Sequence, residues 1–188
     1  MITVATGLPR SGTSLLMQML KAGGMPALSD GRRAPDDNNP RGYLEYEPVA
    51  QIARNHSWLA EAEGRAIKIV VPLVLRLPEG FEYEVVLIQR DLDEVLTSQR
   101  KMLGQGALVD DAILRPVFER QMDQTLRVLR DAPKVRLLGL VFHEVIADPF
   151  AASEQLAEFS SYALRTSAMA GVVDRRLYRQ QNTQERVD

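Results

Sequence analysis

The N-terminal segment constrains the fold of this chain more than any other part of the sequence. Residues 2–6 are apolar and β-branched, as in a short buried strand, and residues 13–22 place leucine and methionine at helical spacing. Between them lies the sequence GLPRSGTS, residues 7–14. A strand, a tight glycine-bearing loop and a helix in direct succession are typical of an α/β domain.

Apolar strand-like segments and helical segments alternate along the rest of the chain. The strands are predicted over residues 66–71, 83–89 and 135–141, and the helices over residues 47–62, 91–103, 110–130 and 149–159. This alternation predicts a three-layer α/β sandwich with a central parallel sheet, as one domain over residues 1–188, and the loop over residues 7–14 favours the P-loop nucleotide-binding type of this fold. In such sheets, ligands bind at the carboxyl ends of the strands.

Two polar segments are expected to lie outside these elements. Residues 29–42 are rich in Asp, Asn, Arg and Pro, which predicts a long loop. Residues 175–188 are polar and are expected to form a frayed C-terminal tail.

The composition excludes several classes of function. Lysine and arginine number 23 and aspartate and glutamate 25, so a net charge of -2 does not favour a nucleic-acid partner. The absence of cysteine excludes thiolate metal sites and cysteine nucleophiles, and we expect no metal. No segment approaches the roughly 20 apolar residues of a membrane helix. We therefore expect a cytoplasmic protein with no membrane partner.

The loop over residues 7–14 collects groups that bind an anion. Gly7 and Gly12 allow the backbone to approach a ligand closely, and the helix that follows directs its first N–H groups and its dipole at the same point. Side-chain donors come from Arg10, Ser11, Thr13 and Ser14. Charge-assisted hydrogen bonds contribute about 1.5–3 kcal/mol each. The loop therefore predicts a phosphate or diphosphate ligand; the alternative is a Gly/Ser turn without a ligand.

One residue in this loop disfavours an ordinary nucleoside triphosphatase. The spacing is that of a Walker A loop, but Thr13 occupies the position of the lysine that binds the β- and γ-phosphates. No convincing strand-end aspartate for magnesium is present either, since Asp91 reads as a helix cap.

Residues 8–14 resemble the 5′-phosphosulfate loop of the sulfotransferase family, whose members use 3′-phosphoadenosine-5′-phosphosulfate (PAPS). Arg90, at the end of a predicted strand, and Ser98, about two helical turns later, resemble the 3′-phosphate motif of the same family. Residues 39–45 and 142–149 resemble two further segments of the family, and His143 stands where the family places a tyrosine near the adenine. The resemblance implies that the nucleotide is held by Pro9, Arg10, Ser11, Gly12, Thr13, Ser14, Arg90, Ser98 and His143.

The resemblance also implies a reaction, the transfer of a sulfuryl group from PAPS to a hydroxyl or amine of an unidentified acceptor. Arg10 is expected to stabilise the transferred group electrostatically, because an arginine does not readily donate its proton. Glu45 is the first candidate for the general base and Glu47 the second, although either is equally well read as a carboxylate at the start of a helix. Lys68 either faces the cleft or lies at the surface with its charge in water.

Two features depart from the family pattern and leave other functions open. Valine stands at position 70, where many members have a histidine base, and the glycine-rich C-terminal loop is not evident. The alternatives are a P-loop nucleotide kinase and a non-catalytic nucleotide-binding module. Residues 29–42 and the helix predicted after them are expected to shape the acceptor pocket.

Overall fold

The computed structural model describes residues 1–36, 39–103 and 110–178, and within these ranges the chain is an α/β protein with one parallel sheet. The sheet order is β2-β1-β3-β4, formed by β1 (Ile2–Thr6), β2 (Ala66–Lys68), β3 (Tyr83–Gln89) and β4 (Val135–Val141). The predicted bounds of β1, β3 and β4 are confirmed, and so is the parallel arrangement.

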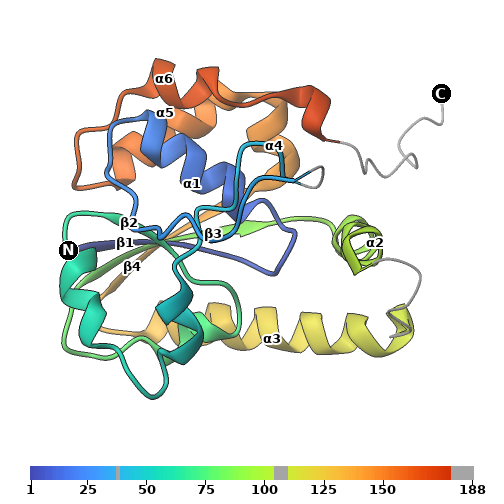
Figure 1. Ribbon diagram of the computed structural model, residues 1–188, viewed down its shortest axis with the longest axis horizontal. Helices are drawn as coiled ribbons and strands as arrows, with labels where there is room; N and C mark the ends of the chain where they lie inside the picture. The colour runs from blue at the N-terminus through green and yellow to red at the C-terminus, as the bar shows by residue number, and fades with distance from the viewer. Residues whose placement is uncertain (37–38, 104–109, 179–188) are drawn as a thin grey trace.

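Helices cover both faces of the sheet and complete a three-layer sandwich (Figure 1). One face is covered by α1 (Thr13–Ala22), α4 (Phe142–Ala147), α5 (Pro149–Phe159) and α6 (Thr166–Gly171). The other face is covered by α3 (Asp111–Asp131) and the 3₁₀ helices η1 (Glu47–Gln51), η2 (Ser57–Ala62) and η3 (Leu73–Arg76). Helix α2 (Leu92–Leu103) follows β3 beyond the end of the sheet.

The strands read as continuous apolar runs because successive side chains enter two different cores. In β3, Val85 and Leu87 belong to the core beneath α3, whereas Val86 and Ile88 belong to the core beneath α1. Each of these side chains is at most 1% exposed. Burial of such a side chain stabilises the fold by about 1.5–3 kcal/mol, so the sheet is anchored on both sides.

The prediction of a single helix over residues 47–62 was wrong. Two short 3₁₀ helices, η1 and η2, lie there instead. Between them, Asn55 Oδ1 accepts hydrogen bonds from the backbone N of Ser57 at 3.1 Å and from its Oγ at 2.9 Å. Such local side-chain bonds compete with the helical hydrogen-bond pattern.

Other predicted boundaries also need correction. Regular β2 ends at Lys68 rather than at Val71, although the Val71 N still donates to the Gly7 O at 3.0 Å. Helices α4 and α6 were not predicted. The tail was expected to fray from Arg175, but Arg175–Leu177 forms the 3₁₀ helix η4, and the Arg175 Nε donates to the Ile146 O at 3.0 Å. Residues 179–188 of the predicted tail lie outside the described residues.

The strand order places the loops after β1 and β3 side by side. After β1 the chain goes to β2 on one side, and after β3 it goes to β4 on the other side. The loops that follow the neighbouring strands β1 and β3 therefore start side by side at the carboxyl edge of the sheet and lead in opposite directions. Ligands of open α/β sheets bind at such a reversal. Within the described ranges, no helix is long and apolar enough to cross a membrane.

Candidate functional site

The loop between β1 and α1 has a backbone conformation that its sequence explains. Gly12 has φ 109°, and a Cβ there would lie 2.5 Å from Cδ2 of the Phe142 ring, so only glycine fits. Arg10 also has a positive φ, 74°, which costs a side-chain-bearing residue about 1–3 kcal/mol. The Ser11 N closes the turn on the Leu8 O at 3.1 Å.

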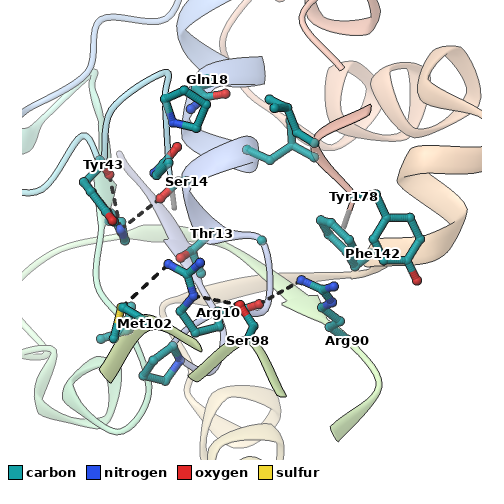
Figure 2. A pocket seen from close by; sticks show the side chains of 18 of the residues that line it. Arg10, Thr13, Ser14, Gln18, Tyr43, Arg90, Ser98, Met102, Phe142 and Tyr178 are labelled. Atoms are coloured by element: carbon teal, nitrogen blue, oxygen red, sulfur yellow. Dashed lines mark hydrogen bonds between the residues drawn. The ribbon is translucent and has the colours of Figure 1, made fainter. Parts of the chain in front are cut away.

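Arg10 joins the loop to the end of β3 and to α2 (Figure 2). Its Nε donates to the Ser98 Oγ at 3.0 Å, and its Nη1 lies 3.8 Å from the Met102 Sδ. The strained backbone turns the Arg10 carbonyl toward Arg90, whose Nη1 donates to it at 3.3 Å. The two motifs found in the sequence are therefore joined by hydrogen bonds through three of the predicted residues.

Arg90 is held in place from several sides. Its Nε pairs with the Glu94 Oε2 at 2.7 Å, and both side chains are buried. Its guanidinium carbon lies 4.5 Å from the centre of the Phe142 ring and 5.2 Å from that of Tyr178. Burial and a hydrogen bond to Glu94 raise the pKa of Tyr178 to about 12, so its hydroxyl remains a donor at neutral pH. These contacts fix the orientation of the guanidinium.

A cavity of about 270 Å³, here called the loop cavity, opens beside this network. The predicted residues Pro9, Arg10, Gly12, Thr13, Ser14, Glu45, Arg90 and Ser98 line it. Among the described lining residues, the cations outnumber the carboxylates: Arg10, Arg33, Lys68, Arg90 and Lys101 against Glu45 and Asp174. The first N–H groups of α1 have no acceptor within the helix. The loop cavity is therefore suited to a multiply charged anion.

Three predicted site residues do not line the loop cavity. Ser11 is 1% exposed, and its Oγ has no hydrogen-bond partner within the described ranges. His143 is exposed on α4, and its neighbour Phe142 lines the cavity instead. Glu47 is exposed and forms an ion pair with Arg32.

Glu45 and Lys68 form an ion pair at the wall of the loop cavity. The Lys68 Nζ lies 2.9 Å from the Glu45 Oε1, and it also donates to the Ser14 Oγ and the Tyr43 O, both at 3.2 Å. Lys68 is only 7% exposed, and this burial lowers its pKa. Burial raises the pKa of Glu45, but the hydrogen bond and charge of Lys68, with Arg33, outweigh it and leave that pKa below its ordinary value. Lys68 thus faces the cleft, one of the two positions expected for it.

Tyr43 organises the cations on this side of the cavity. Its ring lies 3.4 Å from the guanidinium carbon of Arg33 and 5.7 Å from the Lys68 Nζ. Its hydroxyl donates to the carboxylate of Asp36 at 2.8 Å. The segment 39–45 was noted in the sequence only as a resemblance, and these contacts now give it a structural role.

Several residues of the site could not be found by sequence reasoning. Arg33 lies in the predicted loop over residues 29–42, Tyr43 directly follows that loop, and Tyr178 lies in the predicted tail. Phe142 follows β4 without any breaker between strand and helix. The signals present were the noted segments 39–45 and 142–149, which contain Tyr43 and Phe142, and the loop over residues 29–42, which contains Arg33.

A scan of the chain against models of protein families and a search of curated proteins both give no match.

Proposed function

We propose that this protein is a sulfotransferase that moves a sulfuryl group from PAPS to a small acceptor. The observation that carries the proposal is the link between two anion-binding elements. Arg10, in a loop at a helix N-terminus, bonds to Ser98, and Arg90 bonds to the Arg10 carbonyl. A nucleotide with phosphoryl groups on both its 5′ and 3′ positions needs two such elements side by side.

The charge of the loop cavity supports an anionic leaving group. Sulfuryl transfer resembles phosphoryl transfer, in which catalysis depends on positioning and electrostatic stabilisation. Arg10 and Lys68 both line the cavity, and Lys68 reaches Ser14 of the loop. Together they supply positive charge to a loop in which Thr13 stands at the position of the Walker lysine.

The proton of the acceptor also requires a destination. In the proposed reaction, the acceptor oxygen forms a bond to sulfur as the bond between sulfur and the 5′-phosphate oxygen breaks. The acceptor proton passes to the carboxylate of Glu45 and then to solvent, and adenosine 3′,5′-bisphosphate leaves. A glutamate is ionised at neutral pH at its ordinary pKa, and Lys68 and Arg33 lower this pKa further, so Glu45 is in the form that a proton acceptor requires.

One observation favours a second candidate, a nucleotide-binding module without catalysis. Val70 lines the loop cavity at the position where the sulfotransferase resemblance implies a histidine base. Glu45 is a weaker base than histidine, and its ion pair with Lys68 weakens it further. This candidate predicts nucleotide affinity without any product.

The test is transfer of radioactive sulfate from labelled PAPS to water and to a panel of aliphatic and aromatic alcohols and amines. We expect a labelled product, and we expect Arg10→Ala to lower its rate at least a hundredfold. Arg54→Ala, an exposed arginine outside the loop cavity, is the matched control and should keep the full rate. Intact PAPS in every arm, or magnesium-dependent turnover of ATP instead, contradicts the proposal.

A further inference from the structure

A second cavity of about 590 Å³, here called the side cavity, adjoins the loop cavity. The two share one wall, formed by Arg33, Glu45, Lys68 and Val70. The ion pair between Glu45 and Lys68 therefore lies between the proposed nucleotide site and a separate volume of a size that suits a small ligand.

Beyond this wall, the side cavity has an apolar part and a charged part. The apolar part is lined by Tyr46, Val49, Ala50 and Leu73. Tyr46 has a fixed ring, because it packs edge-on against the buried Trp58 with the ring centroids 5.5 Å apart. A rigid aromatic side chain and several aliphatic side chains lining one volume suit a ring-shaped ligand.

The charges around the side cavity compensate one another. Its described lining contains Asp30, Glu45 and Glu47 against Arg32, Arg33 and Lys68. Asp30 accepts from the backbone N of Arg32 at 3.0 Å and from that of Glu47 at 2.7 Å, and these two side chains form an ion pair with each other. Glu45 pairs with both Lys68 and Arg33. A charged ligand would lose hydration here without gaining an uncompensated counter-charge.

We infer that the side cavity binds the acceptor and selects an uncharged molecule with an apolar ring and a terminal hydroxyl. The inference rests on the proposed function, because it takes Glu45 as the group that receives the hydroxyl proton. The ring lies against Tyr46 and Leu73, and the hydroxyl points to the shared wall. The lining of the loop cavity has more cations than carboxylates, whereas the lining of the side cavity has equal numbers of both. The two cavities therefore select a charged donor and a neutral acceptor.

The test compares three ligands of one shape: 2-phenylethanol, phenylacetate and 2-phenylethylammonium. Their dissociation constants are measured by ligand-observed NMR at pH 7 with saturating adenosine 3′,5′-bisphosphate. We expect the alcohol to bind at least tenfold more tightly than either ion. With labelled PAPS in place of the bisphosphate, the alcohol should also be the best sulfate acceptor of the three.

Two variants locate the site. Ala50 is exposed in η1 and lines the side cavity, so Ala50→Phe should fill the volume without disturbing the core and weaken alcohol binding at least tenfold. Ala60→Phe, at an exposed position in η2 away from both cavities, is the matched control and should change nothing. The affinity of Ala50→Phe for the bisphosphate reports whether its loop cavity is intact.

The outcomes separate this inference from the proposed function. If the bisphosphate does not bind the wild-type protein, the proposed function itself fails. If it binds but either ion binds as tightly as the alcohol, the selectivity inferred here is wrong. If the alcohol affinity survives Ala50→Phe, the side cavity is not the site. If Ala50→Phe loses the bisphosphate as well, the ranking of the three ligands on the wild-type protein decides.

Discussion

Replacement of Ser98 by alanine tests the site at the point where its two elements meet. The Ser98 side chain is 3% exposed, and its Oγ accepts from the Arg10 Nε at 3.0 Å. If this hydroxyl also donates to a 3′-phosphate, its loss removes a hydrogen bond to a charged group, worth about 1.5–3 kcal/mol. The affinity for adenosine 3′,5′-bisphosphate should therefore fall by at least about tenfold.

The 5′-monophosphate separates this effect from a general loosening of the loop. Adenosine 5′-monophosphate has no 3′-phosphate. Its binding free energy should therefore weaken only because Arg10 has lost its hydrogen bond to Ser98, by about 0.5–1.5 kcal/mol. Both nucleotides lose that contribution, and only the bisphosphate also loses the hydrogen bond to its 3′-phosphate. Isothermal titration calorimetry of both nucleotides against wild type and Ser98→Ala should therefore show the ratio of their affinities falling roughly tenfold to a hundredfold. Thr97→Ala is the matched control, because the Thr97 Oγ1 accepts from Arg100 outside the loop cavity. An unchanged ratio would refute the assignment of Ser98.

Two further predictions follow from the same geometry. Gly12→Ala places a side chain on a left-handed backbone and against the Phe142 ring, so it should lower the free energy of unfolding by about 2–4 kcal/mol. Thermal or urea unfolding measures this change. A decrease of less than about 0.5 kcal/mol would contradict the close approach of Gly12 to Phe142. On the acid side, kcat/KM should decrease only at a pH below 4.5, the ordinary pKa of a glutamate, because the pKa of Glu45 is lowered. On the alkaline side, it should begin to decrease at a pH below 10.5, the ordinary pKa of a lysine, because the pKa of Lys68 is lowered. Glu45→Gln should remove the acid limb and most of the rate, whereas an acid limb that survives would exclude Glu45 as the base.

The sequence was sufficient to predict the parts of the fold that local chemistry determines. The strand Ile2–Thr6, the loop after it and the helix from Thr13 follow from β-branched residues, glycines and helical spacing over a short stretch. Arg90 and Ser98 were found because they lie close together in the sequence, one at the end of a strand and the other about two turns into the helix that follows it. The parallel sheet then brings them beside Arg10, since parallel strands end at the same edge.

The remaining parts depend on contacts between distant segments. No local pattern indicates that Tyr178 packs against Arg90, or that Lys68 lies between Ser14 and Glu45. His143 illustrates the opposite error, because a position taken from a resemblance proved to be exposed while its neighbour Phe142 contacts the site. A shift of one residue on a helix changes the direction of a side chain by about 100°.

The most direct test of the central claim is the preference of the wild-type protein among three nucleotides. Calorimetric titration without and with magnesium compares adenosine 3′,5′-bisphosphate, adenosine 5′-monophosphate and ATP. We expect the bisphosphate to bind at least about tenfold more tightly than the monophosphate without magnesium, because the proposed function assigns Arg90 and Ser98, which are hydrogen-bonded to Arg10, to a second phosphate site. Equal affinity for the two, or tighter binding of ATP with magnesium, would contradict that claim.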